Sequence, residues 1–187
     1  MLEYSLHLFN KLQVKLSIQY LLFIAVFAGV FFSSCVKKPT YPSEPVIAYK
    51  DFLRYGNSTD PDSVELVISF TDNEGDIGIE QSDTEGVFQK GGNVYMIFYY
   101  WDTTGTDHWA SLNANGNPPP IVDTLLFPYR VPPVLTSGEK SQPMKGLIYV
   151  KQSPFVNLYD KIKYEVYMYD KAKHISNRIT TPDITFP

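Results

Sequence analysis

Residues 162–169 read Ile-Lys-Tyr-Glu-Val-Tyr-Met-Tyr, and this stretch decides the fold class because its apolar side chains recur at every second position. From Ile162 onward the apolar residues alternate with Lys163, Glu165 and two tyrosines. Such a period places alternate side chains on opposite faces of a β-strand. Residues 64–70, Val-Glu-Leu-Val-Ile-Ser-Phe, follow the same pattern. The two stretches therefore predict strands that each bury one face.

Six further stretches are expected to form strands: Val46–Arg54, Val94–Trp101, Trp109–Leu112, Ile121–Phe127, Leu147–Lys151 and Ile179–Phe186. The stretch 94–101 is apolar on both faces, which is typical of a central strand that is covered on both sides or lined by aromatics. Clusters of glycine, asparagine and proline mark the turns, and no segment after residue 34 has a helical period. The sequence predicts an all-β fold, an immunoglobulin-like β-sandwich of seven or eight strands, with a closed barrel as the main alternative.

The composition of the 187-residue chain excludes several classes of protein. Apolar residues make up 44% of the chain and the net charge is only −4, which excludes a disordered protein. With 16 Lys and Arg against 20 Asp and Glu, there is no basic excess to bind nucleic acid. One cysteine excludes a disulfide framework, and three histidines leave little material for a histidine-based metal centre.

The N-terminal region has the pattern of a secretory signal peptide, with Lys11 and Lys15 before an apolar run from Tyr20 to Phe32. Small residues then precede Cys35, in an arrangement that resembles the lipobox of bacterial lipoproteins. In that family the cysteine thiol is alkylated with diacylglycerol, the preceding peptide is cleaved, and the new amine is acylated, as with palmitate. The resemblance implies a lipid anchor at Cys35. An uncleaved helix over Leu16–Val36 that spans the membrane, or an unmodified cysteine, are the alternatives.

The chain accordingly divides into three parts: a lipoprotein signal peptide over 1–34, the lipidated cysteine with a proline-rich tether over 35–45, and the sandwich domain over 46–187. Three prolines in the tether make it extended and semi-rigid. Both kinds of membrane anchor export the domain from the cytoplasm.

Two longer segments carry a resemblance to a family. Residues 70–78, Phe-Thr-Asp-Asn-Glu-Gly-Asp-Ile-Gly, and residues 160–177 resemble uncharacterised lipoproteins of the Bacteroidota, in which a lipobox precedes an immunoglobulin- or fibronectin-like sandwich. The resemblance covers roughly residues 41–187 and implies a non-enzymatic lipoprotein of the outer membrane. Surface-displayed relatives often carry acidic residues after the lipid cysteine, whereas Lys37 and Lys38 stand there in this chain. The domain is therefore expected on either the outer or the periplasmic face of this membrane.

The loop after the second expected strand carries three carboxylates within five residues: Asp72, Glu74 and Asp76. Oxygen ligands at alternate positions suit Ca²⁺, which extracellular domains often bind weakly. The EF-hand pattern is not met, because Ile77 occupies the position that requires glycine. A sandwich would also be able to bring Asp170 and Asn177 to this loop. The alternative, which is the commoner case, is a solvated turn with glycines at the unusual backbone angles.

Trp101 and Trp109 flank a Thr-Thr-Gly-Thr turn, and Tyr99 lies two residues before the first of them. Exposed aromatic rings beside hydrogen-bonding groups are typical of sites that bind sugars or peptides. The more common alternative is that the two tryptophans pack against each other across a hairpin.

Catalytic motifs are missing, since the sequence has neither GxSxG nor HExxH, and Asp102, Asp107 and His108 are typical of a surface turn. We expect a non-enzymatic protein without a cofactor other than calcium. Its expected partners are the membrane, through the lipid on Cys35, and a glycan or a protein bound at the cell surface. The alternative is a periplasm-facing accessory or structural subunit that docks onto an envelope complex. Exposed, coplanar tryptophans would favour the first, and buried tryptophans with an open sheet edge the second.

Overall fold

The structure, a computed structural model, describes residues 38–57, 60–104, 108–112, 126–135, 138–153 and 159–186. The expected signal peptide, Cys35 and the alternative spanning helix lie outside these residues. Within the described part of the chain, no helix is long and apolar enough to cross a membrane. The described strands all belong to one compact unit, Pro39–Pro187.

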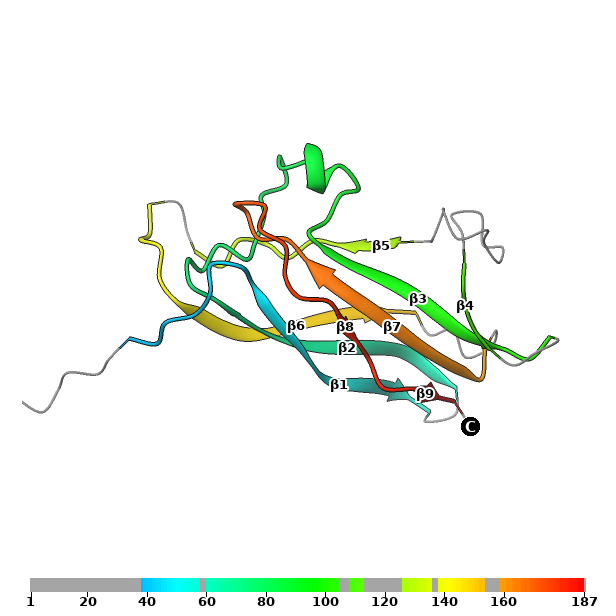
Figure 1. Ribbon diagram of the computed structural model, residues 1–187. Coiled ribbons are helices and arrows are strands. Elements are labelled where there is room, and N and C mark those ends of the chain that lie inside the picture. The colour runs from blue at the N-terminus through cyan, green and yellow to red at the C-terminus, as the bar shows by residue number, and fades with distance from the viewer. Residues whose placement is uncertain are drawn as a thin grey trace, which may run out of the picture. The chain divides into compact units, whose positions relative to one another are not determined.

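The first sheet contains three antiparallel strands in the order β1-β2-β6 (Figure 1). Their bounds are Val46–Gly56 for β1, Pro61–Asp72 for β2 and Met144–Gln152 for β6. Among the described strands, β6 pairs with β2 alone, so its outer edge has no described partner. The side chains of Leu147 and Tyr149 on β6 are 47% and 55% exposed.

The second sheet is built around the antiparallel pair of β3 (Val94–Asp102) and β7 (Lys161–Met168). The outer edge of β3 pairs with β4 (His108–Ser111) and with β5 (Leu126–Tyr129). The outer edge of β7 pairs with β8 (Ile179–Thr180) and with β9 (Ile184–Thr185). A short 3₁₀ turn, Gly86–Phe88, lies in the loop between β2 and β3.

Alternation along the strands decides which side chains fill the space between the sheets. The inward residues of β2, β3 and β7 form one buried cluster: Val64, Leu66, Ile68, Phe70, Val94, Met96, Phe98, Tyr100, Ile162, Tyr164, Val166 and Met168. Burying each large apolar side chain of this kind contributes about 1.5–3 kcal/mol. The half-buried strands predicted over 64–70 and 162–169 are therefore confirmed.

The first half of β3 is buried on its outer face as well. Tyr95 and Ile97 point away from the sandwich core, yet they are only 3% and 9% exposed. The preceding loop covers Tyr95, whose hydroxyl donates hydrogen bonds to the carbonyls of Val87 and Gly92. The Tyr95 ring also stacks on Tyr167 of β7, with 5.5 Å between centroids. This cover explains why both faces of the strand are apolar in sequence.

The strand order β1-β2-β6 facing β4-β3-β7-β8 corresponds to strands A-B-E and C′-C-F-G of an immunoglobulin-like sandwich. The predicted all-β sandwich is thus confirmed. The last expected strand, 179–186, is divided into β8 and β9, because Pro182 between them has no N–H to donate. The strand expected over 121–127 is described from Leu126 to Tyr129, and residues 121–125 lie outside the described ranges.

Candidate functional site

The acidic loop follows directly from β2, whose last residue is Asp72. The Asp72 side chain folds back over the loop, and its Oδ2 accepts hydrogen bonds from the N–H groups of Gly75 at 2.5 Å and Asp76 at 3.2 Å. Gly75 has a φ of +73°, and a Cβ at this position would lie 2.6 Å from the carbonyl oxygen of Gln142. The backbone of this turn therefore needs glycine at position 75 and a side-chain oxygen acceptor at position 72.

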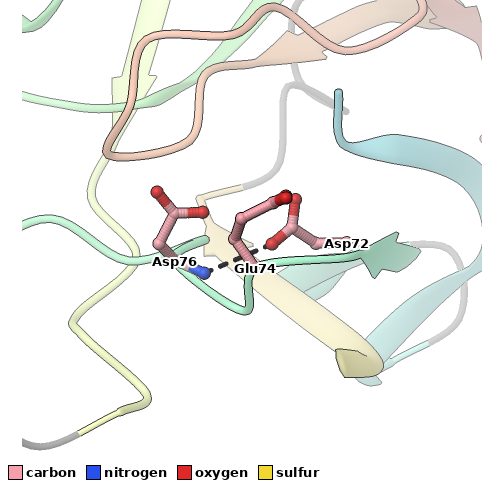
Figure 2. Close-up of side chains that lie close together, drawn as sticks. All are labelled: Asp72, Glu74 and Asp76. Atoms are coloured by element: carbon pink, nitrogen blue, oxygen red, sulfur yellow. Dashed lines mark hydrogen bonds between the residues drawn. The ribbon is translucent and has the colours of Figure 1, made fainter. Parts of the chain in front are cut away.

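The turn does not account for all the carboxylate oxygens of Asp72, Glu74 and Asp76, which we call the acidic triad. A carboxylate oxygen of each member lies within 4.8 Å of those of the other two (Figure 2). Three oxygens are buried and have no hydrogen-bond partner among the described residues: Oδ1 of Asp72, Oε2 of Glu74 and Oδ1 of Asp76. Unpaired buried oxygens are rare and costly in folded proteins.

The second oxygen of each carboxylate is fixed by the protein. Oε1 of Glu74 accepts hydrogen bonds from the Ser43 hydroxyl at 3.2 Å and from the Asn73 amide at 3.3 Å. Oδ2 of Asp76 accepts one from the N–H of Ala172 at 3.2 Å. Ser43 precedes β1 and Ala172 follows β7, so three separate segments orient the acidic triad.

The pKa of Asp72 is raised to about 6, chiefly by burial and also by the nearby carboxylates of Asp76 and Asp170, against the lowering effect of the backbone donors of Gly75 and Asp76. Asp72 is 0% exposed, so its carboxylate is ionised at neutral pH only at a cost. His174, on the neighbouring loop, pairs with Asp170 instead of with the acidic triad, since its Nδ1 lies 2.8 Å from Oδ2 of Asp170. Among the described residues, no lysine or arginine forms an ion pair with the acidic triad.

Two asparagines hold the chain around this loop. Asn93 is fully buried, and its amide donates to the carbonyls of Ile77 at 2.7 Å and Tyr169 at 3.0 Å, while its Oδ1 accepts from Val131 at 2.9 Å. Asn177 binds the N–H and the carbonyl of Ile47 on β1, at 2.8 and 2.9 Å.

The sandwich brings Asp170 to the acidic loop, as expected. The loop that contains Asp170 binds Asp76 through the N–H groups of Lys171 and Ala172. Asn177 offers this loop no ligand, because both groups of its amide bind Ile47 on β1, whose partner on β2 is Phe70.

The two tryptophans lie at the other end of the second sheet, in the β3–β4 hairpin. Trp101 pairs directly with Trp109, and their rings meet edge to face, with centroids 5.3 Å apart and planes at 77°. The cross-strand packing weighed as the commoner case is thus what the structure shows. The tryptophans are half-buried and are not coplanar, so neither criterion for choosing between the two functions is met in full.

Lysines from β7 cover this pair. Nζ of Lys161 lies 4.8 Å from the ring centre of Trp101 and 5.2 Å from that of Trp109. Nζ of Lys163 lies 4.1 Å from Trp109 and 5.8 Å from Tyr99. The outward face at this end therefore combines aromatic rings with two positive charges in cation–π geometry.

Beside the pair is a hollow of about 420 Å³, which we call the Trp101 hollow; its walls are Tyr100, Trp101, Asp102, Thr103, Thr104, Tyr159, Asp160 and Lys161. Tyr100 and Tyr159 stack with 4.3 Å between centroids. Oδ1 of Asp102 accepts hydrogen bonds from the hydroxyl and N–H of Thr104 at 2.7 and 2.8 Å, and these bonds lower the pKa of Asp102. The hollow thus offers aromatic walls and an ionised, pre-oriented acceptor.

Of the residues predicted for ligand binding, Trp101 lines the hollow, whereas Trp109 and Tyr99 lie under the lysines of the outer face. The sequence reasoning missed Tyr159, Asp160 and Lys161, which lie 58 to 60 residues after Trp101 in the chain. Only the antiparallel register of β3 and β7, in which Tyr100 faces Ile162, brings them there. Asp102 faces His108 across the hairpin, and Asp107 lies outside the described residues.

Comparison with known proteins does not identify a family or a function for the chain. The sequence matches no protein-family model, and no curated protein or solved structure is significantly similar to it.

Proposed function

We propose that the β-sandwich is a non-catalytic module that binds carbohydrate in the Trp101 hollow, and that the lipid on Cys35 anchors it to the outer membrane of a bacterium. The observation that carries the proposal is the hollow itself. Its volume of about 420 Å³ falls in the usual range of small-ligand sites, roughly 300–1,000 Å³. It also lies at a hairpin end of a rigid sheet, where binding residues are commonly placed.

The chemistry of the walls favours a neutral sugar. Aromatic rings pack against the apolar C–H face of a pyranose, and carboxylates accept hydrogen bonds from its hydroxyl groups. The hollow contains Asp102 and Asp160 but only one lysine, Lys161, whose charge is shared with Asp183 at 2.7 Å. This balance disfavours anionic ligands, because two carboxylates would repel them.

The test is a screen of neutral and acidic glycans against the full-length protein in detergent, followed by calorimetry on any glycan that binds. Trp101→Ala is expected to weaken binding of a neutral glycan by about tenfold or more, since an aromatic anchor is removed. Tyr149→Ala, which removes an exposed aromatic ring from the opposite sheet, serves as the matched control. Equal losses in the two variants, or no bound glycan, would overturn the proposal.

A second candidate function rests on the outer edge of β6. No strand in the described part of the chain pairs with this edge, and Leu147 and Tyr149 are exposed, so β6 is suited to pairing with an extended segment of another envelope protein. A photocrosslinking amino acid at position 149 should then capture a partner in intact cells, whereas one at position 101 should not. Capture from position 101 alone would contradict docking through β6.

The proposed anchor and its orientation are tested in the same cells. Cys35→Ala should release the protein from the membrane and abolish its labelling with a palmitate analogue. Retention of the unlabelled variant in the membrane would favour the spanning helix. Digestion of residues 46–187 by protease added to intact cells, with a periplasmic control left intact, would locate the domain on the cell surface. Protection in intact cells, with digestion after lysis, would locate it in the periplasm.

A further inference from the structure

The acidic triad lies away from the Trp101 hollow and has no role in carbohydrate binding. Its members are held in place by hydrogen bonds to one oxygen each, while their remaining oxygens are buried and unpaired. A solvated turn would leave these oxygens in contact with water. The arrangement instead resembles a ligand set without its cation, because one cation satisfies several unpaired anionic oxygens at once and also offsets their charge.

Asp72 provides an observation independent of the clustering. Its side chain is 0% exposed, its Oδ2 completes the turn, and its Oδ1 is buried without a partner beside the carboxylate of Glu74 (Figure 2). The turn needs only the first of these oxygens. A backbone turn of the same shape is therefore compatible with asparagine, and the second carboxylate oxygen of Asp72 is left without a structural explanation.

We propose that Asp72, Glu74 and Asp76 bind one Ca²⁺ ion. Oxygens within 4.8 Å of one another need only small side-chain adjustments to reach one cation at a metal–oxygen distance of about 2.4 Å, which is typical of Ca²⁺. Three carboxylates without histidine or cysteine form a hard ligand set, which excludes a preference for zinc. Mg²⁺ requires a near-octahedral site with shorter bonds and gives up its water reluctantly, so oxygens spread over up to 4.8 Å suit it less well.

Asp170 supports the site without acting as a ligand. Both of its oxygens are engaged by His174, one by the backbone N–H and one by the ring, each at 2.8 Å. Its loop fixes Asp76 through Lys171 and Ala172, and the segment before β1 fixes Glu74 through Ser43. Binding of Ca²⁺ should therefore order the junction between the expected tether and the domain together with the β7–β8 loop.

The experiment is calorimetric titration of the full-length protein in detergent, first with EGTA to remove bound ions and then with CaCl₂. Extracellular modules bind Ca²⁺ with dissociation constants of about 10⁻⁴–10⁻³ M, so we expect saturable one-to-one binding in this range. At a Ca²⁺ concentration ten times the dissociation constant, the melting temperature should rise by about 3–6 °C. Equimolar MgCl₂ should produce a smaller shift.

Asp72→Asn keeps the acceptor for Gly75 and removes the charge, so it should abolish both the binding heat and the thermal shift. Asp60→Asn, an exposed residue just before the opposite end of β2, should retain both. No binding to the wild-type protein at 10 mM CaCl₂, or an equal loss in Asp60→Asn, would overturn the proposal. Because Trp101→Ala leaves the triad intact, it should bind Ca²⁺ normally even if carbohydrate binding fails.

Discussion

The two ends of the second sheet differ in how their charged groups are satisfied. At the end where β3 begins and β7 finishes, the acidic triad holds three buried oxygens without a partner. At the opposite end, Asp102 is bound by Thr104, and Lys161 by Asp183 and two indole rings. The charged groups named at the hollow end are thus paired within the protein, whereas the acidic end keeps carboxylate oxygens that no described residue binds. The acidic end should therefore be the more sensitive of the two to changes in its charged and hydrogen-bonding groups.

The largest effect is expected from Asn93→Ala, which breaks the framework of the acidic end. Three hydrogen bonds to Ile77, Tyr169 and Val131 are lost, and buried backbone groups are left unpaired. We expect the free energy of unfolding, measured with urea, to fall by about 3–4 kcal/mol. Thr104→Ala, at the hollow end, should lower the free energy of unfolding by less than about 1 kcal/mol, because Thr104 is exposed. Equal losses would show that the two ends do not differ in this way.

The second-largest effect is expected to be an increase in stability, caused by a substitution at Asp72. In the presence of EGTA, Asp72→Asn should raise the free energy of unfolding by about 1–2 kcal/mol, because it removes a buried charge and places an N–H donor beside unpaired oxygens. In saturating CaCl₂ the order should reverse, with the wild-type protein at least as stable as the variant. Thermal unfolding in both buffers measures this, and a variant that is less stable than the wild type in EGTA contradicts it.

At the hollow end, the edge-to-face pair of Trp101 and Trp109 should contribute a moderate coupling. A double-mutant cycle with the two alanine variants is expected to give an interaction energy of about 0.5–1.5 kcal/mol. The value should be the same in EGTA and in CaCl₂, since the pair lies at the far end of the sheet. Dependence of the coupling on Ca²⁺ would show that the two ends communicate.

The smallest effect is expected from Asp183→Asn, which breaks the ion pair with Lys161. The two side chains are 48% and 32% exposed, and a pair this exposed is worth less than about 1 kcal/mol. Urea unfolding at low and high salt provides the measurement. A loss above about 2 kcal/mol would contradict this expectation and would mean that the charges at the hollow end depend strongly on one another.

The features that the sequence predicted correctly are local ones. Alternation over 64–70 and 162–169 identified the strands and their buried faces, because side chains two apart on a strand must share a face. Trp101 and Trp109 were expected to meet because a short turn separates them. The acidic triad was visible because its three members lie within five residues.

The features that could not be predicted join distant parts of the chain. Nothing in the sequence shows that Tyr159 and Lys161 complete the walls beside Trp101, or that Ser43 and Ala172 orient the carboxylates. Asn177 illustrates the difficulty: its amide binds Ile47, which is 130 residues away in the chain, and no sequence pattern indicates this partner.

The sequence by itself thus determined the strands, their inward faces and the local clusters of chemistry. The tertiary structure alone decided which strands are neighbours and in what register, because these depend on how two sheets pack against each other. It also decided that three carboxylate oxygens are buried without a partner. A sequence pattern specifies which groups are polar, but only packing specifies which of them are removed from water and left to find a ligand.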